Sequence, residues 1–186
     1  MCGRYSLEVS YDLFASRYGI EVESIEYSGS KEIFPTNQSP LIMNQKDLVL
    51  GKWGFSNPYS SKVLINARLE TVNQKPTFKK AFQETRCLIP ATSFFEWEKI
   101  GTEKERRKIF VDRQFIFSMA GIVRQEEDQL VYSILTMDSN EEFKHVHHRM
   151  PVILQAKDEL KYLNKNTSIK DVLSLCQQSN PVLLVR

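Results

Sequence analysis

Cysteine is the second residue of the chain, which begins MCGRY. A small second residue generally permits removal of the initiator methionine, so we expect Met1 to be removed. The mature chain would then begin at Cys2, whose α-amine and thiol would stand on adjacent carbons as a 1,2-aminothiol. This places two nucleophiles on one residue, an arrangement that no internal position of a polypeptide offers. The alternative is that Cys2 is one more buried small hydrophobe, the usual fate of a free cysteine.

Three other reactive residues interrupt apolar segments of the chain. Asn66 lies in VLINAR, Glu96 lies between two aromatic residues in SFFEWE, and His147 directly precedes HRMPVIL. A carboxylate flanked by aromatic rings is costly to bury as an anion, so its pKa tends to rise and it can serve as a general acid or base. An imidazole titrates near neutral pH and can do the same.

Each of these residues also has a simpler interpretation. Strand alternation would place Glu96 in water and its aromatic neighbours inside, and Asn66 could bond the backbone of a loop. The histidines could be surface residues of a loop. His145 and His147 would share one strand face, but no Asp, Glu or Cys stands nearby at ligand spacing. We therefore predict no metal site and no cofactor.

The segments that carry these residues predict a β-rich fold. Helices are expected over residues 10–19, with Ser10 as N-cap, and over residues 75–86, 139–146, 156–164 and 168–179. A hairpin is expected over residues 40–55, and strands within residues 62–72, 86–100, 108–123, 129–137, 149–155 and 180–186. Strands outnumber helices and occur in blocks, without regular β-α-β alternation. The pattern therefore indicates an α+β fold, a mainly antiparallel, barrel-like sheet flanked by a few helices in a single domain.

Composition places further bounds on the protein. The 186 residues suit one domain, and the net charge of +2, from 25 Lys and Arg against 23 Asp and Glu, is too small to indicate a nucleic-acid partner by itself. Three cysteines without a CxxC pair argue against a disulfide framework or a cysteine zinc site. No signal segment or run of about 18 apolar residues is present. We expect a cytoplasmic protein that does not bind membranes.

Five short motifs occur in order along about four fifths of the chain: MCGRY, INARLET, RCLIPATSFFEW, MAGIV and HHRMPVIL. This pattern resembles the SOS-response-associated peptidase (SRAP) family, whose domain forms covalent adducts with abasic sites in single-stranded DNA. The resemblance implies one SRAP-like domain over residues 2–186. It implies single-stranded DNA containing abasic sites as the partner, and nucleoid association when the protein is engaged on DNA. We expect a monomer.

The resemblance also assigns roles to individual residues. The implied catalytic residues are Cys2, Asn66, Glu96 and His147. The implied DNA-binding residues are Arg4 and Arg68 towards phosphates, with Trp53 and Pro35 as aromatic and rigid elements. Beyond the resemblance, Arg86, Lys79 and Lys80 are weaker candidates for phosphate contacts, although FKK could equally be a solvated helix face. Three positions depart from the family pattern. Val123 replaces a usual tryptophan, Ser93 a customary glycine and His148 a common acidic residue.

The chemistry of an abasic site fits this assignment. The ring-opened sugar is an aldehyde, which an amine converts to an imine and a thiol two carbons away closes to a thiazolidine. An α-amine is roughly 9–17% neutral at pH ~7, against about 0.04% for a lysine. His147 would help to open the sugar ring, Glu96 would move protons during imine formation and its reversal, and Asn66 would hold the reacting groups.

Two other functions are compatible with the same residues. Cys2 could be the nucleophile of a peptidase or other hydrolase, with His147 as base and Asn66 or Glu96 as the orienting group. An imine without ring closure would permit β-elimination of the strand, which is a lyase activity. The protein could also be a non-catalytic module that binds single-stranded DNA.

Overall fold

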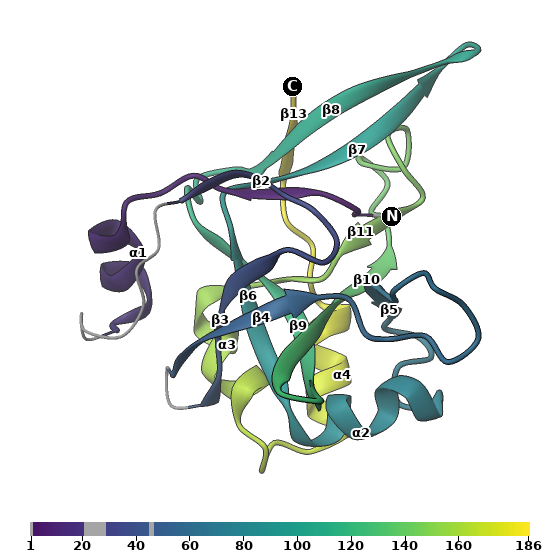
Figure 1. Cartoon of the computed structure of the whole chain (residues 1–186). Coiled ribbons are helices and arrows are strands. Elements are labelled where there is room, and N and C mark those ends of the chain that lie inside the picture. Colours follow the sequence, from purple (N-terminus) through teal and green to yellow (C-terminus); the bar gives the residue numbers. More distant parts are fainter. Residues whose placement is uncertain (1, 21–28, 45–46) are drawn as a thin grey trace.

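The computed structural model describes residues 2–20, 29–44 and 47–186 (Figure 1). Its centre is a barrel closed by the pairs β3–β4, β4–β10, β10–β9, β9–β6 and β6–β3, of which only β4–β10 is parallel. The strands are β3 (Gln38–Ile42), β4 (Leu48–Trp53), β6 (Arg86–Ala91), β9 (Phe117–Glu126) and β10 (Gln129–Asp138). All six residues of β6 are buried, because one face packs into the barrel and the other is covered from outside.

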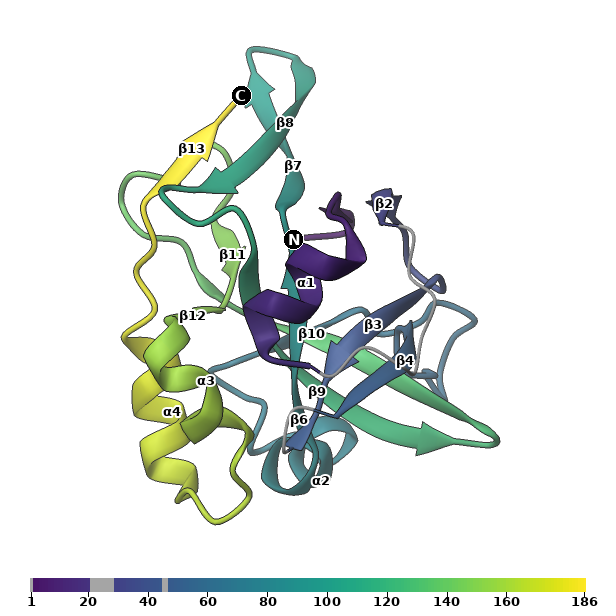
Figure 2. The same cartoon turned by 90° about the vertical axis from the view of Figure 1, so that its left-hand side faces the viewer.

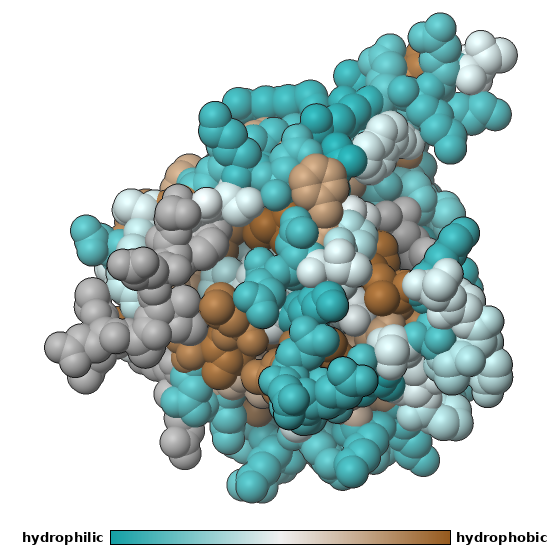
Figure 3. All heavy atoms as spheres, in the orientation of Figure 1, coloured by the Kyte–Doolittle hydropathy of each residue, from teal (hydrophilic) through white to brown (hydrophobic). Residues whose placement is uncertain are grey.

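A second, antiparallel sheet lies across the top of the barrel in Figure 1, in the order β13-β8-β7-β1-β2. Its strands are β1 (Tyr5–Leu7), β2 (Ser30–Ile33), β7 (Ser93–Ile100), β8 (Glu103–Val111) and β13 (Leu183–Val185). Only Thr92 separates β6 from β7, so the chain passes directly from the barrel into this sheet. The far ends of β7 and β8 project from the body as a hairpin with a hydrophilic surface (Figure 3).

Three short strands bring distant segments together along the barrel. Both β5 (Asn66–Arg68) and β11 (Arg149–Pro151) pair with β10, the first parallel and the second antiparallel. Residue Thr136 of β10 lies opposite Arg68 on one side and Pro151 on the other. The strand β12 (Ile153–Leu154) pairs with β9. The motifs INAR and HHRMP therefore flank one end of the same strand.

The helices follow the expected signals closely. They are α1 (Tyr11–Tyr18), α2 (Pro76–Glu84), α3 (Ala156–Leu163) and α4 (Ile169–Gln177). Ser10 caps α1 by accepting the N–H of Leu13, and Gly19 ends it at φ +62°. Ser168 caps α4 by accepting the N–H of Asp171. In Figure 2, α3 and α4 lie together at one side of the barrel. None of the helices in the described ranges is both long and apolar enough to span a bilayer.

The α+β class is confirmed, while some expected elements differ. The helix predicted over residues 139–146 is wrong, because the segment forms turns. The side chain of Asn140 accepts a hydrogen bond from the N–H of Phe143. The N–H of Ser139 donates to the carbonyl of His148, and this bond closes the segment into a loop. The segment 108–123 divides between β8 and β9, which belong to different sheets. The centre of the expected hairpin 40–55, at residues 45–46, lies outside the described residues.

Candidate active site

Cys2 lies beside Glu96 because β1 pairs with β7. Tyr5 is opposite Phe94, and the N–H of Phe95 donates to the carbonyl of Arg4 at 2.9 Å, so the chain before β1 runs along β7 towards Glu96. Cys2 is fully buried, and its thiol donates to the carbonyl of Arg4 at 3.7 Å. Burial raises the pKa of this thiol well above its usual value, and the charge of Glu96 raises it further. Cys2 is thus a protonated thiol next to a carboxyl group.

Glu96 faces the interior, contrary to the simple alternation that would place it in water. Its exposed fraction is 2%. Its aromatic neighbours lie on the opposite face of β7, where Arg106 covers the ring of Phe95 at 4.1 Å and Arg4 lies 5.3 Å from the ring of Trp97. Burial raises the pKa of the Glu96 carboxyl, so this group gains a proton more readily than a free glutamate.

Asn66 connects β5 to the start of the chain. Its side-chain Nδ2 donates to the carbonyl of Cys2 at 3.0 Å. Its Oδ1 is buried and has no hydrogen-bond partner among the residues described. Asn66 therefore fixes the first peptide group and leaves one acceptor for another molecule or for the α-amine.

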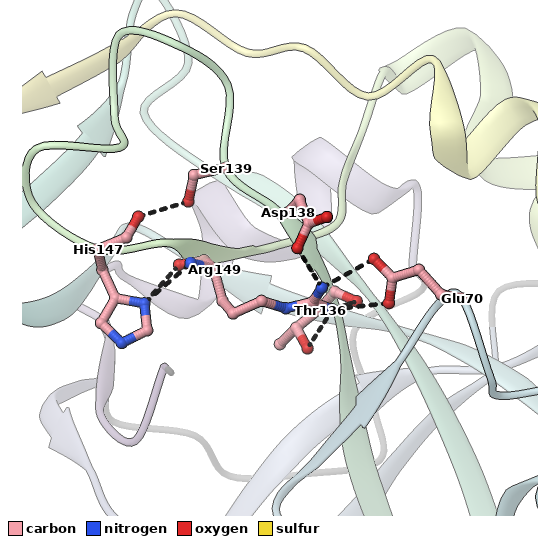
Figure 4. A network of polar contacts seen from close by, with 6 residues as sticks. All are labelled: Glu70, Thr136, Asp138, Ser139, His147 and Arg149. Carbon is pink, nitrogen blue, oxygen red and sulfur yellow. Dashed lines mark hydrogen bonds and ion pairs between the residues drawn. The ribbon is translucent and has the colours of Figure 1, made fainter.

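His147 is held by its own loop. Its Nδ1 lies 3.0 Å from both the backbone N and the backbone O of Arg149, and its carbonyl accepts the hydroxyl of Ser139 at 2.7 Å (Figure 4). The other ring nitrogen points away from Arg149 (Figure 4). Burial lowers the pKa of His147, and the nearby charges of His148 and Arg149 act in the same direction.

Arg149 anchors this loop to the barrel. Its buried guanidinium donates to both carboxylate oxygens of Glu70 at 2.8 and 2.9 Å, to Asp138 at 2.7 Å and to the carbonyl of Thr136 at 2.6 Å (Figure 4). Burial raises the pKa of Glu70, but the hydrogen bonds and charge of Arg149, together with a backbone hydrogen bond, outweigh burial and hold that pKa below the usual value. The network spans β10, β11 and Glu70, the second residue after β5.

His148 adds a second imidazole to the site. Its ring stacks on that of His147, with centroids 4.4 Å apart and planes at 27°. His148 is exposed, and its charge lowers the pKa of Glu96, which partly offsets the effect of burial. The departure from the family pattern at this position therefore places a second imidazole, rather than an acidic group, against the ring of His147.

Comparison with known sequences decides the family. The family model described as SOS response associated peptidase (SRAP) matches residues 1–184. The chain belongs to the SRAP family.

Individual relatives of this SRAP chain agree with that assignment. It is 34% identical over 185 residues to the abasic site processing protein YoaM of Bacillus subtilis, covering 90% of this chain and 82% of YoaM. It is 26% identical over 198 residues to the abasic site processing protein HMCES of Xenopus tropicalis, covering 82% of this chain and 59% of HMCES. A crystal structure of a Bacteroides thetaiotaomicron protein matches with a TM-score of 0.83 at 26% identity, covering 99% of this chain and 91% of the other.

Two of the expected DNA contacts, Trp53 and Arg86, do not agree with the structure. Trp53 is fully buried against Tyr5 and Tyr132 and donates to the carbonyl of Ile65 at 2.9 Å, so it offers no face to a base. Arg86 is also buried. Its guanidinium donates to the carbonyls at the ends of two helices, Phe82 and Gln83 in α2, and Tyr162 and Asn164 at the end of α3. These carbonyls have no hydrogen-bond partner within their helices, so they account for the buried guanidinium of Arg86, and no phosphate is needed to explain its position.

The other expected contacts lie at the surface. Arg68 is exposed and makes no ion pair within the described part of the chain. Arg4 is half-buried against the ring of Phe34, at 4.4 Å. Pro35 is partly exposed in a turn whose Thr36 has φ +73°, and the backbone of Trp53 bonds this turn at Thr36 and Asn37. The backbone of Trp53 thus stabilises the Pro35 turn through these two hydrogen bonds.

Several residues of the site escaped the sequence-based prediction. Glu70 and Arg149 stand inside the motifs INARLET and HHRMPVIL, so their proximity to Arg68 and His147 was the available signal. Outside this network, Tyr59 is 93% exposed in the loop that joins β4 to β5, and nothing in NPYSS distinguishes it from an ordinary loop aromatic. Val123 and Ser93 are buried in β9 and β7, away from the solvent. Met1 lies outside the described residues, and its removal stays a prediction.

Proposed function

We propose that this SRAP protein processes abasic sites in single-stranded DNA, and that it does so by covalent capture through Cys2. The observation that carries this proposal is that Asn66 and Glu96, from separate parts of the chain, converge on Cys2, and that the histidine loop reaches Glu96 through His148, which stacks on His147. The choice of substrate rests on the relatives named above, which are called abasic site processing proteins.

The reaction begins at the α-amine that removal of Met1 would expose. The amine adds to the aldehyde carbon of the ring-opened sugar, and loss of one water leaves an imine. The thiol of Cys2 then adds to the imine carbon, and its proton passes to the imine nitrogen. The product is a thiazolidine, formed with net release of one water. Because both nucleophiles belong to one residue, the second step is intramolecular and has a high effective concentration.

The carboxyl group of Glu96 and the imidazole of His147 fit two separate proton transfers. Glu96 lies beside the Cys2 thiol, whose raised pKa means that ring closure needs a base. A carboxyl group with a raised pKa can take that proton and return it to the imine nitrogen. His147, fixed at Nδ1 by the backbone of Arg149, would protonate the sugar ring oxygen as the ring opens.

The same electrostatics count against a thiol peptidase mechanism. Such enzymes use a cysteine whose pKa is lowered by a neighbouring imidazolium. Here burial and Glu96 raise the thiol pKa, and the bond that Nδ1 of His147 makes is to the backbone of Arg149. Amine attack first, with the thiol following as a neutral group, suits this environment better than attack by a thiolate.

The test is crosslinking to a single-stranded oligonucleotide with one abasic site. Wild-type protein should give a heat-stable protein–DNA band that intact DNA does not give. Cys2→Ala should lose this band but keep an amine able to form an imine, which would appear as nicked DNA. Cys176→Ala, which removes another buried thiol on α4, should crosslink normally.

Three results would overturn the proposal. They are an unchanged stable crosslink with Cys2→Ala, an intact protein mass that retains a blocked Met1 throughout the native population, and cleavage of a casein-like substrate without any crosslink. The last result would favour the hydrolase, and salt-sensitive binding alone would favour a passive DNA-binding module.

A further inference from the structure

One carboxylate joins two arginines on the outer face of the upper sheet. Oε2 of Glu32, in the edge strand β2, lies 3.1 Å from the guanidinium of Arg4, and its Oε1 contacts the guanidinium of Arg106 in β8. The side chains of Arg4, Glu32 and Arg106 are 27%, 26% and 41% exposed. The cluster carries two positive charges and one negative charge, so a net positive charge remains.

Both arginines are positioned by aromatic rings. Arg4 lies over Phe34 at 4.4 Å and near Trp97 at 5.3 Å, and Arg106 lies over Phe95 at 4.1 Å. A guanidinium stacked on a ring keeps its N–H edges free for an anion, and its fork geometry suits carboxylates and phosphates equally. The rings thus orient the two cations whether or not Glu32 is present.

A phosphodiester resembles the carboxylate that occupies this position. Each carries one negative charge on two oxygens that can be shared between two guanidinium groups. Exposed ion pairs contribute little free energy, so an incoming phosphate can replace Glu32 at small cost. Arg4 is two residues from Cys2 in the chain, which places this exchange at the edge of the candidate active site.

We propose that Arg4 and Arg106 together form a phosphodiester site for the DNA backbone beside Cys2, and that Glu32 occupies this site until a DNA phosphate displaces it. The inference rests on the proposed function for the nature of the ligand. It adds Arg106 as a DNA-binding residue and Glu32 as an internal competitor that weakens binding to DNA.

The experiment measures the affinity of each variant for an intact single-stranded oligonucleotide over a range of salt concentrations. Glu32→Gln should bind roughly 2- to 30-fold more tightly than wild type at low salt, because two exposed ion pairs no longer have to be broken. Arg106→Gln should bind more weakly and should lower the slope of log K against log salt by about 0.7, the loss of one phosphate contact on a single strand. The gain from Glu32→Gln should shrink when Arg106→Gln is also present.

Glu84→Gln is the matched control. Glu84 is an exposed glutamate of α2, at the opposite end of the molecule from the upper sheet, and makes no ion pair within the residues described (Figure 1). The Glu84→Gln substitution changes the net charge by the same amount as Glu32→Gln and should leave the affinity for single-stranded DNA almost unchanged. Unchanged or weaker binding by Glu32→Gln, an equal gain from Glu84→Gln, or unchanged binding by Arg106→Gln would each overturn the inference. Crosslinking of the wild-type protein to abasic DNA tests the proposed function separately. The proposed function and the phosphodiester site can therefore be contradicted independently of each other.

Discussion

Nδ1 of His147 lies 3.0 Å from both the backbone N and the backbone O of Arg149. A neutral imidazole protonated at its other nitrogen accepts the N–H of Arg149, and an imidazolium can donate to the carbonyl instead. The ring therefore has a partner in both protonation states. This is the arrangement that a group needs if it is to gain and lose a proton without moving.

The pH dependence of crosslinking should reveal whether His147 acts as an acid. Burial lowers its pKa from the usual value of about 6.5, so its protonated form is populated only at lower pH. His147→Ala should slow single-turnover crosslinking by ~10²–10⁴-fold where the imidazolium is populated, and the ratio of wild-type to variant rates should fall as pH rises. Rates measured between pH 5 and 8 test this, and a ratio that grows with pH would assign His147 as a base.

The Glu70–Arg149 ion pair should support both stability and the histidine loop. Glu70→Gln removes the negative charge and one of the two acceptors that Glu70 offers to the buried guanidinium, and we expect a loss of about 1–2 kcal/mol in the free energy of unfolding together with slower crosslinking. Asp138→Asn is the control, because Asp138 is 80% exposed and makes one contact. Equal effects of the two substitutions in urea unfolding would contradict this ranking.

The same pair should make stability depend on pH. The pKa of Glu70 is lowered in the folded state, so its contribution is present above the unfolded value of about 4.5 and is lost as pH falls through the lower, folded value. Wild type should therefore lose more stability than Glu70→Gln below pH ~4.5. Thermal unfolding of both proteins across pH 3–7 measures this, and parallel curves would exclude Glu70 as a source of acid sensitivity.

Asn66 should matter for rate more than for DNA binding. Its amide holds the carbonyl of Cys2 at 3.0 Å, and a displacement of about 1 Å in a reacting group can cost ~10²-fold in rate. Asn66→Ala should therefore slow crosslinking by about 10- to 100-fold with little change in affinity for intact DNA. Asn73→Ala removes an amide that pairs with Gln83 outside the site and should crosslink at the wild-type rate. A loss of affinity that accounts for the whole effect would contradict a positioning role.

Substitutions of Trp53 and Tyr59 should affect different properties, the first protein stability and the second DNA affinity. Trp53→Phe removes a buried hydrogen bond and should cost about 1–2 kcal/mol of stability with little direct effect on DNA affinity. Tyr59→Ala should leave stability unchanged and weaken binding to single strands, since stacking contributes ~1–3 kcal/mol per base. Phe115→Ala, at an exposed aromatic beside α1 and the segment that precedes β13, serves as control. Unaltered DNA affinity in Tyr59→Ala would exclude Tyr59 as a DNA-binding residue.

The sequence by itself determined the fold class and the type of chemistry. Periodicity and turn residues predicted a β-rich α+β chain with helices at Ser10, Pro76 and Ser168, because caps and alternation are local properties. Motif order predicted the SRAP family. The roles of Cys2, Asn66, Glu96 and His147 stay predictions that the geometry supports.

Tertiary structure alone decided which face of each strand is covered. Alternation divides SFFEWE into two faces but does not say which of them the barrel covers, so Glu96 could be placed inside only once β7 had packed between β1 and β8. Trp53 lies in the core and Arg86 binds helix ends for the same reason, since their partners are 12 or more residues away in the chain or belong to other elements. The Glu32 bridge between Arg4 and Arg106 likewise exists only because the upper sheet brings β2 and β8 to the start of the chain.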